Sequence, residues 1–191
     1  MADIPTHHRV FGSCRDFVTG ETLADTDDER YRQKLARFLV EQKGYAKEEL
    51  EMRLKIETLF AQQFVTSTID IAVQLGKRKA MLLRYGPGSL VTRERAAIAA
   101  ARVLVEDQRI PLAVVTNGED AEVLDAATGR VLGEGLAAIP SRKELAAMLP
   151  DLDFSPWPAE KREKELRILN AFDVQVCCAG GPCPLPGAPE G

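Results

Sequence analysis

An acidic residue lies inside one of the most apolar stretches of the sequence. Asp70 follows Ile69 and precedes Ile71 in a run with the alternation of a β-strand. A carboxylate buried among such residues needs a partner, because an unpaired charge is costly to remove from water. Asp70 is therefore the first candidate for a functional residue, and the alternative is an exposed acid at a strand end.

Basic residues follow Asp70 closely and form the second candidate group. They are Lys77, Lys79, Arg84, Arg93 and Arg95. Gathered on one surface, their side chains would bind the phosphate groups of a nucleic acid. A basic turn between two strands also serves solubility alone, so both interpretations stand.

Cysteines offer a third kind of chemistry, a zinc or iron–sulfur site. Cys14 with Cys177 or Cys178 and Cys183 would supply thiolates to such a site. The sequence lacks the paired Cys-x₂-Cys knuckles of common zinc sites, and adjacent cysteines do not easily ligate one tetrahedral ion. Thiols in a reducing compartment are the preferred interpretation.

Composition places these candidates in an ordinary soluble chain. Of 191 residues, 45% are hydrophobic and 28% charged, which suits one domain or one domain with an appendage. The net charge of −4 argues against a basic coat for non-specific nucleic-acid binding. No apolar run reaches the roughly 18 residues of a membrane span, and no signal-peptide core is present. We expect a cytoplasmic protein without a membrane partner.

The elements that position the candidates follow from periodicity and capping patterns. Thr26 and Glu29 form the Thr-x-x-Glu capping box of a first helix, which ends at Gly44. The expected strands are 52–60, 69–75, 80–85, 111–115, 121–125 and 130–132, with turn-like segments at 62–68 and 76–79. The later helices are expected at 92–106, 141–148 and 158–172. The resulting division is an extended lead-in at 1–25, a domain at 26–149, a helical appendage at 150–178 and a disordered Pro/Gly-rich tail at 179–191.

Several of these features together resemble the N-terminal domain of type I restriction enzyme R subunits. Glu29-x-x-Arg32-Gln33 with Gly44-Tyr45 is similar to its opening helix, Asp70 matches its first acid, and residues 111–118, ending in Thr-Asn-Gly, match its later half. The resemblance covers residues 26–149. It implies an α/β fold of the restriction-endonuclease-like, PD-(D/E)XK class, a mixed central sheet flanked by helices.

The resemblance also implies a metal site that this sequence does not complete. In the family an Asp and a Glu-x-Lys hold Mg²⁺ beside the scissile phosphate, and an acid of the first helix, here Glu29, supports them. The Glu and Lys positions fall on Arg84 and Gly86, and residues 81–88 contain no Asp, Glu or Lys. An arginine cannot coordinate a cation and repels one.

Three hypotheses follow. In the first, the domain is associated with DNA but catalytically degenerate, and Arg84 pairs with Asp70 in place of the metal. In the second, it is an active Mg²⁺-dependent DNA endonuclease that uses Asp70, Glu29 and a displaced Glu94, with Lys77 or Lys79 as its cation. In the third, it is a metal-thiol protein centred on the C-terminal cysteines. No phosphate loop of the form Gly-x₄-Gly-Lys-Ser/Thr occurs, so we expect a stand-alone domain without ATP binding, which a protein partner would direct to a DNA sequence.

Overall fold

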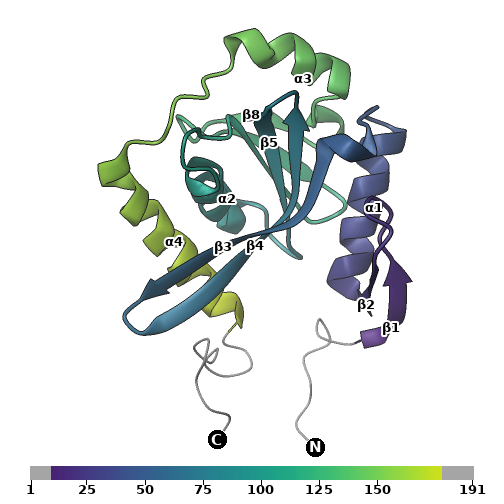
Figure 1. The fold of residues 1–191 in the computed structure, drawn as a ribbon, viewed down its shortest axis with the longest axis horizontal. Helices are drawn as coiled ribbons and strands as arrows, with labels where there is room; N and C mark the ends of the chain where they lie inside the picture. Colours follow the sequence, from purple (N-terminus) through teal and green to yellow (C-terminus); the bar gives the residue numbers. More distant parts are fainter. Residues whose placement is uncertain (1–9, 178–191) are drawn as a thin grey trace, which may run out of the picture.

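The computed structural model describes residues 10–177 (Figure 1). The strands are β1 (Val10–Arg15), β2 (Thr22–Thr26), β3 (Leu50–Phe60), β4 (Gln63–Leu75), β5 (Arg78–Tyr85), β6 (Leu112–Thr116), β7 (Ala121–Asp125) and β8 (Val131–Glu134). The helices are α1 (Asp27–Glu41), α2 (Val91–Val103), α3 (Arg142–Met148) and α4 (Ala159–Cys177), with short 3-10 turns at η2 (Lys47–Glu49), η3 (Leu136–Ala138) and η4 (Leu149–Asp151). None of these helices combines the length and apolar character needed to span a bilayer.

Within residues 10–177, one mixed sheet of six strands forms the centre of the molecule. Its order is β3-β4-β5-β6-β7-β8, and all neighbouring pairs are antiparallel except β5 and β6. A parallel pair needs a crossover connection, and α2 provides it. The prediction of an α/β protein with a mixed central sheet is confirmed.

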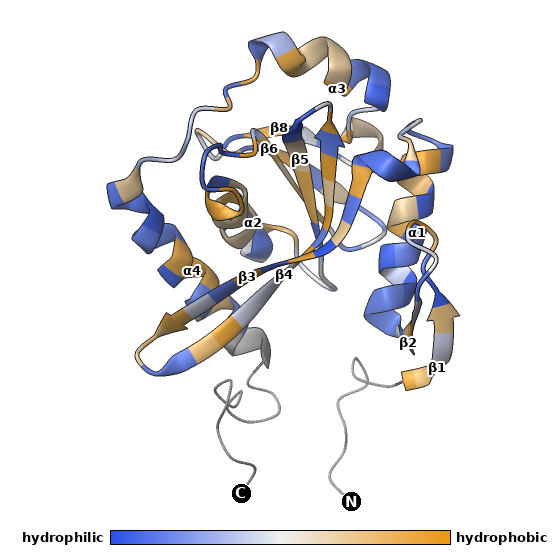
Figure 2. Cartoon of the chain, viewed as in Figure 1, coloured by the Kyte–Doolittle hydropathy of each residue, from blue (hydrophilic) through white to orange (hydrophobic). Residues whose placement is uncertain are grey.

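Helices cover both faces of this sheet and create two apolar cores. On one face, Leu35 and Leu39 of α1 and Leu145 of α3 pack against β4–β7. On the other face, α2 packs against β5 and β6, and α4 packs against α2 and against β3 and β4 (Figure 1). Figure 2 shows the central strands β5 and β6 as largely hydrophobic, which is expected of strands buried on both faces.

Small side chains bring α2 close to the sheet. Six of its buried residues form the run 96–101, in which five are alanines. Short side chains let a helix backbone approach a neighbouring layer, so the tight packing expected of this helix is confirmed. The C-terminal helix α4 lies in the same layer: Leu169 is fully buried, and Asn170 Nδ2 donates to Thr58 Oγ1 and to the backbone oxygen of Gln63.

Two local predictions differ from the structure. Residues 62–68 do not form a turn, because β4 begins at Gln63 and the reversal occurs at Ala61 and Gln62, which have φ of +48° and +63°. Their polar side chains belong to a strand on the outer half of a long hairpin, where strand residues are partly exposed. The lead-in is also more ordered than its weak periodicity indicates, because β1 and β2 pair as a separate hairpin before α1.

A break in the β3–β4 ladder lies next to Asp70. Met52 pairs with Ile71 and Leu54 pairs with Ile69, but Arg53 between them has φ of +54°. This left-handed conformation is unfavourable for a non-glycine residue and bends the strand. As a result, Ile69 belongs to the core under α2 and α4, whereas Ile71 belongs to the core under α1. Asp70 therefore sits where the long hairpin changes from one layer to the other.

Candidate functional site

The carboxylate of Asp70 is buried and fully engaged by hydrogen bonds. Its side chain is 6% exposed. Oδ1 accepts from Arg32 Nε at 2.8 Å and lies 2.7 Å from Arg32 Nη2, and Oδ2 accepts from the backbone N–H of Tyr85 at 2.7 Å. The partner expected for a buried acid is therefore present. It is Arg32 of α1, and the hypothesis that Arg84 pairs with Asp70 is wrong.

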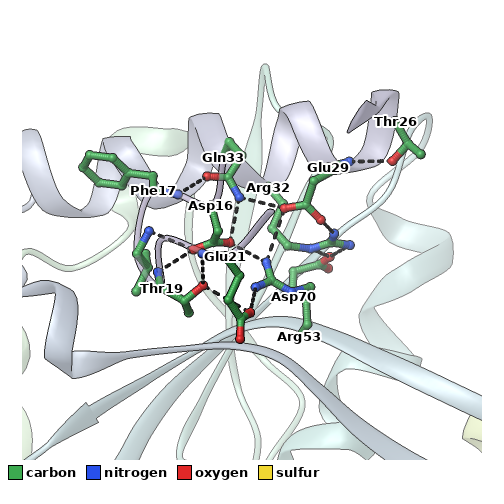
Figure 3. Close-up of polar contacts among 11 residues, drawn as sticks. Asp16, Phe17, Thr19, Glu21, Thr26, Glu29, Arg32, Gln33, Arg53 and Asp70 are labelled. Atoms are coloured by element: carbon green, nitrogen blue, oxygen red, sulfur yellow. Dashed lines mark hydrogen bonds and ion pairs between the residues drawn. The ribbon is translucent and has the colours of Figure 1, made fainter. Parts of the chain in front are cut away.

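The same guanidinium also binds Glu29. Arg32 Nη1 donates to Glu29 Oε2, so one arginine bridges two carboxylates, one on α1 and one on β4 (Figure 3). Burial works to lower the pKa of Arg32, but the charges of Asp70 and Glu29 outweigh it and hold that pKa above its usual value. Arg32 is therefore a permanently charged group between two acids.

A second set of contacts extends this network toward the N-terminal hairpin. Gln33 Nε2 donates to Glu29 Oε1 at 2.7 Å and to Asp16 Oδ2 at 2.9 Å. Arg53 Nη1 donates to Asp16 Oδ2 at 2.6 Å and lies 3.3 Å from Glu29 Oε1. Figure 3 shows these side chains converging from α1, β3 and the turn between β1 and β2. Arg53, whose backbone has a left-handed conformation, thus places its guanidinium between the buried acids Asp16 and Glu29.

The helical spacing of α1 explains why its residues meet here. Positions i, i+3 and i+4 lie on one side of a helix, which places Glu29, Arg32 and Gln33 together. Thr26 Oγ1 accepts from the backbone N–H of Glu29 at 3.2 Å, which confirms the Thr26 half of the predicted capping box; the Glu29 half is not formed. The carboxylate of Glu29 turns to Arg32 and Gln33, so a structural cap does not fully explain this residue.

Asp16 gives the network a dependence on pH. Burial alone would raise its pKa, but hydrogen bonds from the Thr19 backbone, Arg53 and Gln33 outweigh burial and hold that pKa far below its usual value. A depressed carboxylate pKa contributes stability above the unfolded pKa of about 4, and that stability is lost as the pH falls below it.

We therefore expect Asp16→Asn to lower the free energy of unfolding by roughly 1–3 kcal/mol at pH 7, because buried donors lose a charged acceptor. The difference from the wild type should shrink steadily between about pH 5 and pH 2. Urea denaturation at several pH values measures it. A difference that stays constant over that range would show that the charge of Asp16 contributes nothing.

Glu94 does not join Asp70 and Glu29. It lies on the first turn of α2, near Glu122 of β7. Burial raises the pKa of Glu122, and the neighbouring Glu94 and Glu134 raise it further. The displaced acid required by the endonuclease hypothesis therefore belongs to a different cluster of carboxylates.

The five basic candidates do not form one surface. Three of them pair with acids: Lys79 with Glu51 at 2.6 Å, Arg84 with Asp173 at 2.9 Å, and Arg95 with Glu165 at 2.7 Å. Lys77 lies at the β4–β5 turn, at the opposite end of β5 from Arg84, which is about 20 Å away for a strand of this length. Lys77 and Lys79 thus lie at the far end of β5 from the backbone N–H of Tyr85 that binds Asp70.

A cavity of about 270 Å³ opens beside Asp70. It is lined by Asp28, Arg32, Asp70, Tyr85, Gly86, Pro87 and Arg93. Of the five basic candidates, Arg93 alone belongs to this lining. The ring of Tyr85 stacks on the ring of Tyr31 of α1, with the ring centroids 4.7 Å apart. The cavity therefore brings together two acids, two guanidinium groups and an aromatic wall.

The residues at this cavity do not fit a Mg²⁺ site. Mg²⁺ requires oxygen ligands in a near-octahedral arrangement. The oxygens of Asp70 and Glu29 already accept hydrogen bonds from Arg32, and the two positions that would complete the set are Arg84 and Gly86. Among the side chains that the structure describes (residues 10–173), those of His, Cys, Asp and Glu form no group of three or more that could hold an ion.

The cysteine hypothesis falls mostly on residues whose side chains the structure does not describe. Cys14 lies on β1, where burial and then the charge of Glu29 raise the pKa of its thiol. Cys177 is the last residue of α4, and Cys178 and Cys183 lie outside the described residues. A metal site built from Cys14, Cys177 and Cys183 stays a prediction.

Comparison with known proteins gives one match. A family model described as the type I restriction enzyme R protein N terminus matches residues 27–140. This segment is more than half of the chain and runs from the start of α1 to the residue before the cap of α3. No curated protein and no solved structure matches the chain.

Proposed function

Because the chain belongs to the family of type I restriction enzyme R protein N termini, we propose that it is a DNA-contacting domain of the PD-(D/E)XK nuclease fold in which a guanidinium replaces the catalytic metal ion. On this proposal the domain binds DNA and does not cut it. The family membership rests on the match to residues 27–140.

One observation carries this proposal: Arg32 bridges Asp70 and Glu29. A divalent cation and a guanidinium both neutralise two carboxylates, so either one allows them to be buried together. Only the metal has open coordination positions with which to polarise a phosphate and generate hydroxide. An arginine stays charged, donates hydrogen bonds and does neither. The site therefore keeps the electrostatic balance of a nuclease centre without its chemistry.

The strand that follows Asp70 supports the same view. In the family resemblance, the residue about 14 positions after the Asp is an acid that faces the metal. Here that residue is Arg84, and it pairs with Asp173 of α4 on the opposite face of the sheet from α1. To restore a metal ligand at this position, Arg84 would have to be replaced by an acid, and that side chain would have to point toward Asp70 and not toward α4.

We expect the purified protein to leave supercoiled plasmid DNA intact in the presence of Mg²⁺ or Mn²⁺. The same protein should bind a fluorescently labelled DNA duplex at low salt, with an affinity that falls as salt rises. Agarose gels and fluorescence anisotropy measure the two properties. Nicking that disappears in Asp70→Asn, with the variant still folded, would refute the loss of catalysis. Absence of binding at low salt would refute the DNA contact.

A further inference from the structure

The cavity beside Asp70 is lined by two arginines, and one of them, Arg93, has no carboxylate among its hydrogen-bond partners in the described residues. Arg32 donates its hydrogen bonds to Asp70 and Glu29. Arg93 instead donates from Nη2 to the neutral backbone oxygen of Pro87 at 2.8 Å. Its Nε is shielded from solvent and has no hydrogen-bond partner in the described part of the chain. A buried donor without a partner is costly, so this guanidinium is under-satisfied where it stands.

Gly86 makes room for that guanidinium. A Cβ atom placed on Gly86 would lie 2.1 Å from Arg93 Nη1 and 2.4 Å from Arg93 Cζ, closer than atoms can approach. The backbone of Gly86 is fixed at the same time, because its N–H donates to the backbone oxygen of Thr116 at 3.0 Å. Only glycine at this position lets a side chain from α2 lie flat against the end of β5.

We propose that Arg93 is the phosphate-binding residue of this cavity and that its ligand is a phosphodiester group of a nucleic acid. This inference rests on the DNA contact proposed above and names the residue and the chemical group that make it. A guanidinium binds two oxygens of a phosphate through parallel N–H groups, and it does so more specifically than an ammonium. Arg93 sits where such an oxyanion would meet the cavity wall.

The other charges of the cavity make Arg93 decisive. Asp70 is compensated by Arg32 and by the N–H of Tyr85, so it repels an anion less than a free carboxylate would. Asp28 also lines the cavity and opposes an anion. Loss of Arg93 would remove the cation of the lining that does not bind Asp70, so a phosphate would be attracted less strongly. The Tyr85 ring next to it provides a flat apolar surface for the attached sugar or base.

Substitution of Arg93 tests the proposal. Arg93→Ala is expected to raise the dissociation constant for a labelled DNA duplex about tenfold at low salt, since a charge-assisted contact is lost. It should also lower the slope of log affinity against log salt by about one. The conservative variant Arg93→Lys keeps a cation at the same position of α2 and should recover part of the binding, less than arginine gives because an ammonium does not bind two phosphate oxygens in parallel. Thermal melting of each variant establishes that it is folded.

A matched control separates local from global effects. Arg167→Ala removes an equal charge from an exposed position on α4, where Arg167 pairs with the neighbouring Glu163 and lies over the Phe60 ring. It should change the affinity by less than about twofold, because exposed distant charges are screened. If Arg93→Ala and Arg167→Ala weaken binding equally, the cavity is not the contact and the inference fails, while the DNA contact stands.

Inorganic phosphate provides a second readout that does not depend on DNA. In protein labelled with ¹⁵N-arginine, phosphate should shift the side-chain Nε–Hε signal of Arg93 and leave that of Arg167 in place. A shift by phosphate without any DNA binding would keep the anion site and refute the proposed function. Absence of a shift by either phosphate or DNA would overturn the assignment of Arg93.

Discussion

Arg32→Ala is expected to lower the free energy of unfolding by about 3–5 kcal/mol, because removal of one partner leaves buried charges uncompensated. Arg32 is 13% exposed, and its two acids, Asp70 and Glu29, are 6% and 7% exposed. Without the guanidinium these carboxylates repel each other in a poorly solvated site. Urea denaturation at pH 7 measures the loss.

Divalent cations should then reveal what Arg32 replaces. In Arg32→Ala, Asp70 Oδ1 and Glu29 Oε2 lose the guanidinium from which they accept hydrogen bonds, so Mn²⁺ or Mg²⁺ should raise the melting temperature of the variant and leave the wild type unchanged. Arg37→Ala is the control, since Arg37 lies on the same helix in an exposed pair with Glu41. That variant should lose little stability and gain nothing from the metal. A melting temperature of Arg32→Ala that is indifferent to millimolar Mn²⁺ would contradict the proposed replacement.

Removal of either partner of the Arg84–Asp173 pair is the second large effect that we expect. The two side chains are 13% and 9% exposed, and the pair joins β5 to α4. Arg84→Ala or Asp173→Ala should each cost about 3–5 kcal/mol of unfolding free energy, because the remaining charge is left buried. Each partner already has one buried atom, Arg84 Nη1 or Asp173 Oδ2, without a hydrogen bond in the described residues.

The double variant distinguishes a structural pair from a nucleic-acid contact. Arg84→Met with Asp173→Leu replaces the pair by apolar side chains of similar size, which is often neutral or stabilising. We expect the double variant to recover most of the stability lost in either single variant and to bind DNA as the wild type does. Chemical denaturation and fluorescence anisotropy on the four proteins complete the cycle. Loss of DNA binding in the stable double variant would return Arg84 to the binding surface.

Much of the secondary structure follows from local signals. Ser141 caps α3 and forms a capping box with Glu144, and this helix ends at Met148 as the pattern predicts. The turn at Asn117 and Gly118 separates β6 from β7 at the expected place. These elements carry strong hydrophobic periodicity and clear stop signals. Residues 62–68 lack such signals, because their strand is polar and is held by α4 from the far end of the chain.

The site was only partly predictable, because its contacts depend on the bend at Arg53. Asp70 and Glu29 were recognisable from sequence, and the spacing of Arg32 on α1 indicated that it faces the same way as Glu29. A regular hairpin would place Asp70 opposite Arg84, which is the pairing that sequence reasoning favoured. In the structure Asp70 accepts from Arg32 of α1 instead, beside the break in the β3–β4 ladder at Arg53. No local pattern encodes a residue in that conformation.

The matched segment and the cooperative unit of this protein have different boundaries. The family match begins at residue 27 and ends at residue 140, but Asp16 precedes it and Asp173 follows it. Each supplies the acid for a cation inside the segment, Asp16 for Arg53 and Asp173 for Arg84. A fragment excised at the family limits would lose the acid that pairs with Arg84 and the nearer of the two buried acids that pair with Arg53. We therefore expect the piece that folds on its own to be longer than the segment that similarity defines.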